Sequence, residues 1–477
     1  MRIIIVGAGR TGTQLARHLI REKHDVSLIE SNEERARHAS NRLDCMVLHD
    51  EGNSLAALEE AGIARAEALV CVTDSDEVNM IICGLAASRY SKLLKIARVR
   101  NDDYVRLNQY APHNQKILGI DYFVHPDIEA ARAVLRAISH GALGNILDFA
   151  GTSYELGSIN VTEGSAFDGL CIKNYHSVVK EASLVTLVER ETGSLREYIL
   201  PKGSTFLKKG DWVHILARED RIEDIFRLAG HNEKPLHRIG IVGGGRIGTL
   251  IAERILDKKT EENQSHAISS LFRSFMPKSN RRVIMVEQNY TVCKDLAARF
   301  PEALILNEDI SDESFIAEER LGDLDLIITA TANQELNIIA AIYLKSKGVR
   351  RAIAMVSGSG YETIARQLGV DVSIPMQSVV VDSILSNLMG QSIHGVHRLG
   401  DGTLEILETE IRKDSPGAEK AITEFKLSEG GLIMLVNRNN TSFIPQGDYT
   451  FEIGDKVILI AKNGSEAELE KFFGKAK

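Results

Sequence analysis

The sequence has few of the features that mark secreted, metal-binding or membrane-spanning proteins. Its 477 residues include only five cysteines, no Cys-x-x-Cys pair and no Cys/His cluster with zinc-site spacing. The apolar start at 3–6 is too short for a signal-peptide core, and no apolar run approaches the roughly 18–20 residues that span a bilayer. We therefore expect reduced thiols in a cytoplasmic chain that does not itself insert into a membrane.

The sequence also lacks an excess of positive charge, with 57 Lys and Arg residues against 66 Asp and Glu residues. The formal net charge is -9, so the chain has no general electrostatic attraction to nucleic acid or to anionic lipid. This balance argues against nucleic acid as the main partner. The length is too great for a single hydrophobic core, and two to four domains are expected.

The sequence contains an internal duplication. Residues 5–12 read IVGAGRTG and residues 241–248 read IVGGGRIG. A later motif, Pro-x-Gly followed by Gly-Asp and an apolar run, occurs at 201–217 and again at 445–461. One G-x-G-x-x-G match is weak evidence, but two copies that each follow an apolar strand are strong. Because two motifs recur in the same order, the whole unit is duplicated.

Each unit is predicted to have two parts. In the first, short apolar runs alternate with helical patterns, which indicates a parallel sheet with helices on both faces. The expected strands of the first unit are 2–6, 26–30, 46–49, 69–73 and 96–100. Strands with turn residues and a short helix follow. The predicted fold class is α/β: two tandem Rossmann-like parallel-sheet domains, each followed by a small mixed α/β lobe.

Domain boundaries follow from these patterns. A helix after each Rossmann-like domain is a candidate crossover or dimerisation helix. An insertion at about 257–281 has apolar residues on one helical face, and it is either a docking helix for a partner or a helix packed on its own domain. The predicted divisions are 1–124, helix 125–140 and lobe 141–229, then 236–373, helix 374–390 and lobe 394–477.

The first glycine-rich turn has the residues that phosphate binding needs. Gly7 permits the tight turn, Gly9 lets the backbone approach a pyrophosphate, and Gly12 allows close packing of helix on strand. The helix N-terminus then offers unpaired N–H groups, and the Arg10 guanidinium could reach a phosphate oxygen. The predicted phosphate loop consists of Gly7, Ala8, Gly9, Arg10, Thr11 and Gly12.

An acidic residue at the end of the second strand indicates which nucleotide is bound. Glu30 lies 18 residues after Gly12, where a carboxylate can accept hydrogen bonds from ribose hydroxyls and would repel a 2′-phosphate. This favours NAD(H) or plain adenine nucleotides over NADP. A surface glutamate at a strand end is the alternative interpretation.

Further candidates stand at strand ends, which face the ligand crevice in such folds. They are Asp50, Thr73 and Asp74, although the acidic stretch 74–77 is equally well explained as a helix N-cap cluster. Arg98 and Arg100 alternate along the fifth strand and so share a face. Either both reach the crevice or both form ion pairs.

The second unit keeps the loop but loses charge. Met355 and Ser357 stand where the first unit has its two strand-end arginines, and Ala332 replaces Asp74. Each lost charged hydrogen bond removes roughly 1.5–3 kcal/mol of binding, so the first unit is predicted to be the tighter site for highly charged nucleotides. The predicted second site comprises Gly243, Gly244, Gly245, Arg246, Ile247, Gly248, Glu287, Asp309 and Thr331.

These residues carry a family resemblance. The G-x-G-R-x-G turn, Glu30, the TDSDEVN segment 73–79 and the RVRNDDY segment 98–104 resemble the RCK (KTN) domain that regulates potassium conductance. Two such units with their small lobes resemble the TrkA family of peripheral subunits in bacterial Trk potassium uptake. The resemblance implies a homotetramer on the cytoplasmic face of a TrkH- or TrkG-like membrane subunit. It also implies that NAD(H) and ATP/ADP bind and control ion flux.

An NAD-dependent oxidoreductase with two nucleotide folds is the main alternative. Such an enzyme needs a proton-transfer residue beside the nicotinamide and a substrate domain. The 14 histidines are dispersed, and the lobes have only about 80 residues each. We therefore predict a protein that is not an enzyme, with no catalytic or metal-binding residues. A third hypothesis is a metabolic scaffold that binds nucleotide without controlling a channel.

Overall fold

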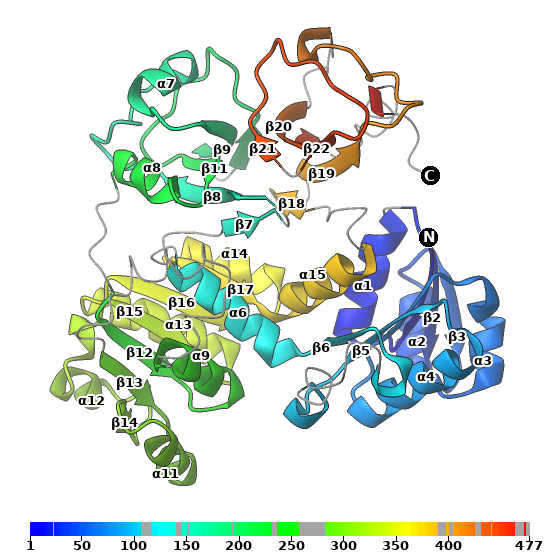
Figure 1. Ribbon diagram of the computed structural model, residues 1–477. Coiled ribbons are helices and arrows are strands. Elements are labelled where there is room, and N and C mark those ends of the chain that lie inside the picture. Colours follow the sequence, from blue (N-terminus) through cyan, green and yellow to red (C-terminus); the bar gives the residue numbers. More distant parts are fainter. Residues whose placement is uncertain are drawn as a thin grey trace.

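The structure is a computed structural model in which two parallel-sheet domains lie below two small lobes (Figure 1). The predicted insertion at 257–281 lies outside the described residues, so its helix stays a prediction. All five cysteines are free thiols, as expected. The structure describes residues 1–21, 23–105, 116–139, 146–149, 152–192, 195–230, 236–256, 282–389, 397–399, 404–424, 431–439, 441–462 and 472–473.

The first parallel sheet has the strand order β3-β2-β1-β4-β5-β6. The strand order reverses between β1 and β4, which opens a crevice at their carboxyl ends. The predicted alternation of strands and helices is confirmed, but β4 ends at Cys71 rather than at Thr73, and β5 ends at Arg98 rather than at Arg100. The sixth strand, β6, was not predicted. The strands are β1 Arg2–Val6, β2 Asp25–Glu30, β3 Met46–His49, β4 Ala68–Cys71, β5 Leu94–Arg98 and β6 Tyr122–Val124. The helices are α1 Arg10–Arg21, α2 Glu33–Ser40, α3 Leu55–Glu60 and α4 Asp76–Arg89.

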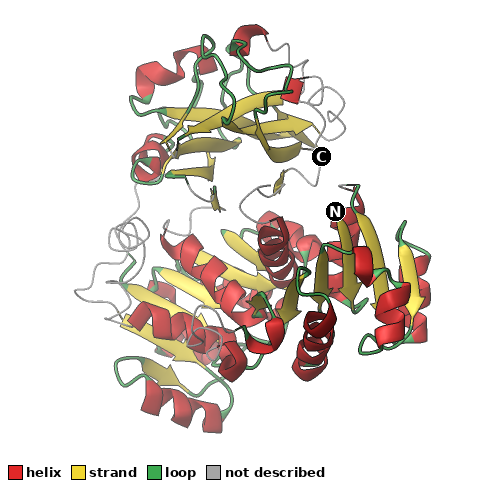
Figure 2. Cartoon of the chain, turned by 45° about the vertical axis from the view of Figure 1, so that its right-hand side comes forward, coloured by secondary structure: helices red, strands yellow, loops and turns green. Residues whose placement is uncertain are grey.

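The second sheet repeats this topology in the order β14-β13-β12-β15-β16-β17. Figure 2 shows helices running alongside the strands of both sheets. The strands are β12 Arg238–Val242, β13 Arg282–Val286, β14 Leu304–Leu306, β15 Leu326–Thr329, β16 Arg351–Val356 and β17 Val372–Pro375. The helices are α9 Arg246–Leu256, α11 Tyr290–Arg299, α12 Glu313–Glu318, α13 Gln334–Ser346 and α14 Ser359–Gln367.

The strand register fixes which residues of the two sheets correspond. Ala68 of β4 pairs with Leu94 of β5, and Leu326 of β15 pairs with Arg351 of β16. Four residues further along each strand stand Arg98 and Met355. The sequence alignment that placed a methionine opposite this arginine is therefore confirmed by the register.

The two crossover helices are exchanged between the halves. Helix α6 (Pro126–Ser139) follows the first sheet, yet its Val134 and Ile138 are buried in the core of the second parallel-sheet domain. Helix α15 (Met376–Met389) follows the second sheet, and its Ile384 is buried in the core of the first. Figure 1 shows α6 beside α9, and α15 beside α1. Each half therefore completes the hydrophobic core of the other.

The lobes are antiparallel sheets in the orders β10-β9-β11-β8-β7 and β18-β19-β22-β20-β21. Their apolar faces pack together, with Leu156 and Leu216 of the first lobe against Ile406 and Ile460 of the second. The first lobe contains β7 Ile146–Asp148, β8 Tyr154–Asn160, β9 Ser183–Thr192, β10 Leu195–Ile199, β11 Trp212–Arg218, α7 Tyr175–Val178 and α8 Ile222–Leu228. The second contains β18 His397–Leu399, β19 Leu404–Glu410, β20 Gly431–Arg438, β21 Thr441–Phe443 and β22 Lys456–Lys462.

The repeated Gly-Asp motif has a structural role in each lobe. Asp211 is buried and accepts hydrogen bonds from the Arg190 guanidinium at 2.8 and 2.6 Å. Asp455 accepts the equivalent pair from Arg438 at 2.7 and 2.8 Å. A bidentate arginine bond satisfies a buried carboxylate without a ligand. The second repeated motif therefore fixes a turn and a strand pair within the lobe.

Candidate nucleotide sites

The glycine loops have the geometry that a phosphate-bearing ligand needs. Gly7 has φ +106°, and a Cβ on Gly12 would lie 1.8 Å from the Gly7 carbonyl oxygen. Gly7 requires glycine because of its positive φ, and Gly12 requires it because helix α1 packs closely against the turn. A Cβ on Gly9 would meet no atom within 4 Å, and the same is true of Gly245 in the second loop. The middle glycine of each loop faces open space, where a ligand can approach the backbone.

Glu30 holds the first loop in place. Its carboxylate is buried and accepts hydrogen bonds from the Ala8 amide at 2.6 Å and from the Asn32 amide at 2.9 Å. Glu287 does the same in the second unit, with the Gly244 amide at 2.7 Å and the Asn289 amide at 2.8 Å. Each carboxylate oxygen keeps a lone pair that a ribose hydroxyl could use. The alternative of a simple surface glutamate is wrong for Glu30.

A buried asparagine that the sequence interpretation missed organises the strand ends. Asn79 is fully buried, and its Nδ2 donates to the Thr73 and Arg98 carbonyl oxygens at 3.2 and 2.9 Å. Its Oδ1 accepts from the Thr73 amide and hydroxyl at 2.9 and 2.7 Å. Asn337 makes the same four bonds to Thr331 and Met355. A threonine followed six residues later by an asparagine in both halves was the available signal.

The arginines of the first unit lie at the open edge of the sheet. The Arg98 side chain is 11% exposed, with Nη1 3.4 Å from the Thr73 carbonyl oxygen and 3.8 Å from Asp74. Burial, and then the charge of Arg100, lower the pKa of the Arg98 guanidinium. A bound anion would relieve this repulsion. The Arg100 amide donates to Asp76 at 2.8 Å, while its side chain is exposed.

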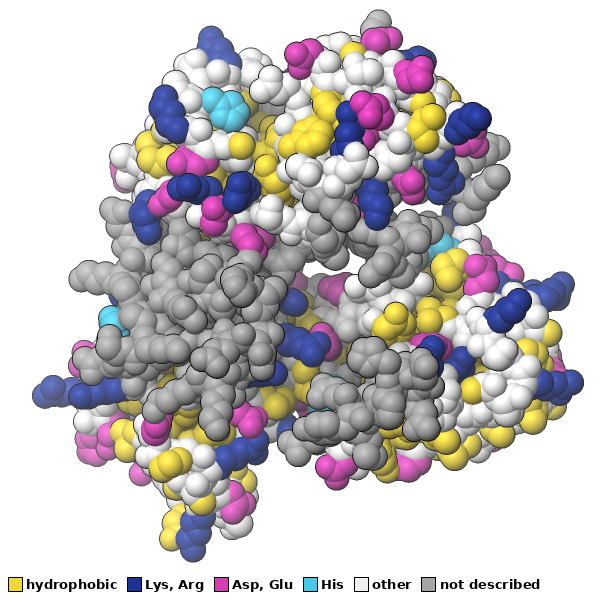
Figure 3. Space-filling view, in the orientation of Figure 1, with side chains coloured by type: hydrophobic (Ala, Val, Ile, Leu, Met, Phe, Trp, Pro, Cys, Tyr) yellow, Lys and Arg dark blue, Asp and Glu magenta, His cyan; other side chains and the backbone are white. Residues whose placement is uncertain are grey.

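A large cavity adjoins the first loop. Its volume is about 1770 Å³, and Arg10, Arg98 and Arg100 line it. Its other walls come from α6, α14, the start of α15 and the first lobe, including Trp212, and Thr331, Met355 and Ser357 of the second unit line it as well. Figure 3 shows an opening between the lobes and the parallel-sheet domains. A ligand on the first loop would therefore lie where three domains meet.

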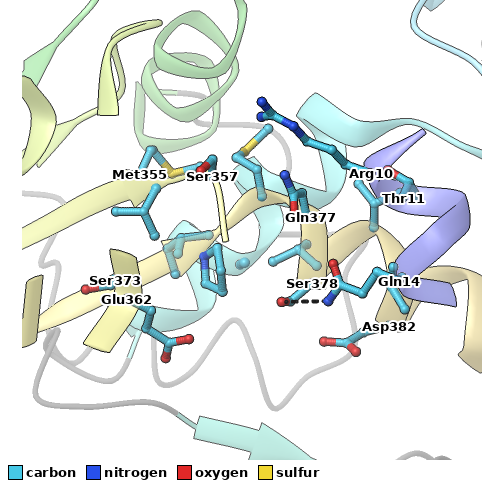
Figure 4. A pocket seen from close by; sticks show the side chains of 18 of the residues that line it. Arg10, Thr11, Gln14, Met355, Ser357, Glu362, Ser373, Gln377, Ser378 and Asp382 are labelled. Atoms are coloured by element: carbon cyan, nitrogen blue, oxygen red, sulfur yellow. Dashed lines mark hydrogen bonds between the residues drawn. The ribbon is translucent and has the colours of Figure 1, made fainter. Parts of the chain in front are cut away.

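The close-up of this cavity shows how α15 faces the first loop. Gln377 and Ser378 of α15 line the cavity together with Arg10, Thr11 and Gln14 of α1 (Figure 4). The Gln14 Nε2 donates to the Ser378 hydroxyl at 3.3 Å, which links the two halves of the chain.

A polar cluster of the first lobe faces the same cavity. The Glu189 carboxylate lies 2.8 Å from His214 Nε2 and 3.6 Å from Arg196. Burial acts to raise the pKa of Glu189, but the hydrogen bond and charge of His214 and the charges of Arg366 and Arg196 lower it overall. Arg366 belongs to α14, so the lobe and the second parallel-sheet domain are coupled electrostatically across the cavity.

The predicted phosphate residue of the second loop is already paired. Arg246 Nη2 lies 2.6 Å from Asp102, and its Nε lies 3.4 Å from Asp127. Both carboxylates belong to the first half of the chain. The sequence could not show this contact, because more than a hundred residues separate the partners.

The remaining predicted residues lie in turns and in first helical turns. The Asp50 carboxylate accepts from the Glu51 amide at 2.6 Å, and the Asp309 carboxylate accepts from the Ser311 amide and hydroxyl at 2.9 and 2.7 Å. Both are exposed. Thr11 and Ile247 are half-buried at the starts of α1 and α9. Gly243 has φ +104°, and a Cβ on Gly248 would lie 2.0 Å from its carbonyl oxygen.

The fold and these sites define a protein with two Rossmann-like domains, each with a glycine loop suited to a phosphate-bearing ligand. The family model of the TrkA-N domain matches residues 3–126 and 269–375, and that of the TrkA-C domain matches residues 406–474. The chain belongs to the TrkA family.

Relatives match along nearly the whole chain. The Trk system potassium uptake protein TrkA of Azorhizobium caulinodans is 26% identical over 99% of this chain and 98% of its own length. The TrkA homolog of Archaeoglobus fulgidus is 28% identical over 99% of this chain and 100% of its own length. These are names of potassium uptake proteins, and neither names an oxidoreductase. They favour the prediction that the chain is not an enzyme over the oxidoreductase alternative.

Solved structures share the fold. The GsuK channel bound to NAD matches with a TM-score of 0.55 and 18% identity, over 99% of this chain and 78% of that chain. The GsuK RCK domain also gives 0.55, with 17% identity, over 98% of this chain and 94% of that chain. In the parts of the chain that the structure describes, no helix combines the length and apolar character of a membrane span.

Proposed function

We propose that this chain is the regulatory subunit of a Trk-type potassium uptake system and binds NAD(H) and ATP/ADP at its glycine loops. Bound nucleotide controls ion flux through a TrkH- or TrkG-like membrane subunit, on whose cytoplasmic face the chain docks peripherally. The names of the relatives support potassium uptake as the process. The NAD-bound channel of the same fold supports a nucleotide as the ligand class.

One observation carries this proposal: the first loop opens into a cavity whose walls come from different domains. A ligand shifts a conformational equilibrium only as far as its affinity differs between the two states. Phosphates between Arg10, Arg100 and the start of α15 would interact differently with each arrangement of these domains. Nucleotide binding can therefore change the angle between the halves and act on a membrane partner.

The first loop is the proposed site for the more highly charged nucleotides. Arg98 and Arg100 line the cavity beside the first loop, whereas the uncharged Met355 and Ser357, which line the same cavity, hold these places in the second unit. Ordinary NAD(H) is favoured over NADP because the Glu30 carboxylate stands at the end of β2, where it would repel a 2′-phosphate.

Assembly into a homotetramer is supported by repeated apolar side chains on the outer helices. Ile81 on α4 is 51% exposed, and Ile339 on α13 is 64% exposed. They lie two residues after Asn79 and Asn337, and so occupy equivalent places in the two halves. A ring of copies could bury both through equivalent contacts. Light scattering of the purified chain tests the tetramer.

Titration calorimetry with ATP, ADP, NADH and NADPH at one fixed salt concentration tests the ligand proposal. We expect saturable binding of the first three and little binding of NADPH. The single tryptophan, Trp212, lines the cavity, so its fluorescence should respond to ligands on the first loop. Tight NADPH binding would contradict the role of Glu30.

Potassium flux into vesicles that contain the membrane subunit tests the regulatory step. Flux that changes with ATP, ADP or NADH only when this chain is added supports the proposal. A chain that binds nucleotide but neither copurifies with the membrane subunit nor alters flux would instead be a scaffold.

A further inference from the structure

The two glycine loops meet different partners at the crossover helices. Arg246 begins α9 and contacts Asp127 in the first turn of α6, at 3.4 Å, and Asp102, at 2.6 Å. The partner positions are held firmly. His125 is 2% exposed, and its Nδ1 accepts from the Ile128 amide at 3.3 Å. Its Nε2 lies 2.8 Å from the Arg100 carbonyl oxygen, 3.2 Å from the Asp102 carboxylate and 2.9 Å from Arg246 Nη2, so the imidazole is part of the same cluster.

The equivalent arginine of the first loop meets no such carboxylates. Helices α6 and α15 have the same length, and the second residue of α15 is Gln377 where α6 has Asp127. Gln377, Arg10 and Thr11 all line the same cavity (Figure 4). In the described parts of the chain, Arg10 has no ion-pair partner. The exchange of helices thus gives the second loop arginine two carboxylate partners, whereas the first loop faces a helix whose first turn contains no acidic residue.

We infer that Asp102 and Asp127 set the ligand preference of the second loop, by neutralising Arg246 and placing negative charge where polyphosphate would bind. The second loop then favours nucleotides with few charges, and the first half of the chain contributes directly to the site of the second half. This inference rests on the proposed function, since it assigns a preference to a site that binds nucleotide.

Two physical effects act in the same direction. A polyphosphate on the second loop must displace two carboxylates from Arg246 before it gains that charge-assisted hydrogen bond. The displaced carboxylates then repel the ligand, most strongly when it carries the most charge. Arg246 and Asp102 are each about two-fifths exposed, so solvent screens this repulsion in part. The preference should therefore be graded with ligand charge.

The test uses the full chain with the first loop blocked by Gly9→Val. The valine side chain would point into the open space beside the loop, which a ligand would otherwise occupy. ATP, ADP and adenosine are titrated by calorimetry into this chain with and without Asp102→Asn and Asp127→Asn. We expect the double asparagine change to tighten ATP binding roughly tenfold, to tighten ADP less and to leave adenosine unchanged. Thermal unfolding checks that each variant folds.

A double-mutant cycle separates this role from a structural one. Arg246→Gln should change ATP affinity of the blocked chain by less than about twofold while the carboxylates are present, because the arginine is already neutralised. In the Asp102→Asn, Asp127→Asn chain the same change should cost roughly tenfold. The reciprocal variant Gln377→Glu, in a chain with Gly245→Val, should weaken ATP binding at the first loop several-fold.

The outcomes distinguish the inference from the proposed function. The inference is overturned if the asparagine changes leave the ATP affinity of the Gly9→Val chain unchanged or lower it. It is also overturned if ATP does not bind to the Gly9→Val chain either with or without the asparagine changes. If Gly9→Val leaves the tightest ATP site intact, the assignment of that site to the first loop fails. The response to the asparagine changes still decides the inference in that case.

Discussion

The two glycine loops of this chain share a backbone and differ in the charges around it. In both, a buried glutamate binds a loop amide, and an asparagine ties a threonine to the neighbouring strand. In the first, arginines line the cavity, and the first turn of the helix packed on α1 contains no acidic residue. In the second, those arginines are absent and the loop arginine is bound by two aspartates. A duplicated fold can thus keep its frame while the charges around its two loops diverge.

The largest expected effect comes from blocking one loop at a time. Gly9→Val places a branched side chain where the ligand would approach the loop backbone. We expect a loss of about 4 kcal/mol, or 1000-fold, in ATP affinity. Gly245→Val is the matched control and should leave the tight ATP site unchanged. Titration calorimetry measures both. Equal losses from the two variants would contradict the assignment of the tight site to the first loop.

Removal of the shared asparagine should damage both halves alike. Asn79→Ala or Asn337→Ala leaves a buried amide and carbonyl oxygen without their partners, which should cost about 3 kcal/mol in the free energy of unfolding. Urea denaturation followed by circular dichroism measures this loss. Asn53→Ala, at an exposed loop residue, should cost little. A large loss in only one half would show that the two frames are not equivalent.

An exchange of residues between the halves tests the strand-end charge. Arg98→Met gives the first site the residue that the second site has, and we expect ATP affinity to fall by about 2 kcal/mol. The affinity for AMP should fall less, because fewer charges lose a partner. Met355→Leu, which keeps the size and polarity of the second site, should not change ATP binding. An unchanged affinity after Arg98→Met would show that this arginine is purely structural.

The smallest effect distinguishes the two loop arginines. Arg10→Gln should weaken ATP binding at the tight site by about 1 kcal/mol, since an exposed guanidinium makes a partly screened contact. Arg246→Gln should alter that affinity by less than about 0.3 kcal/mol. Calorimetry at low and high salt tests this, because the Arg10 contribution should decrease as salt increases. A larger effect from Arg246 would reverse the comparison.

The sequence predicted much of the frame because its signals are local. Alternating apolar runs predicted five strands of the first sheet but not its edge strand β6, and the glycine spacing predicted turns that only glycine can form. A helix, α6 or α15, follows each sheet, and its packing partner in the other half was not predicted. The prediction missed Asn79 and placed the end of β5 two residues late. Strand β5 ends at Arg98 because side chains of α4 form hydrogen bonds with the backbone of residues 98–101. These contacts depend on the packing of α4 beside β5, which the local sequence does not show.

The sequence by itself determined the duplicated order of domains, the positions of the loops and the identity of the charged residues. These depend on residue type and on spacing along a short stretch of chain. Only the tertiary structure decided that α6 and α15 exchange between the halves, and that Asp102 and Asp127 contact Arg246. The apolar face of each of these helices could be buried against either half of the duplicated chain. The sequence pattern is the same in both cases, so it does not show which half the helix contacts.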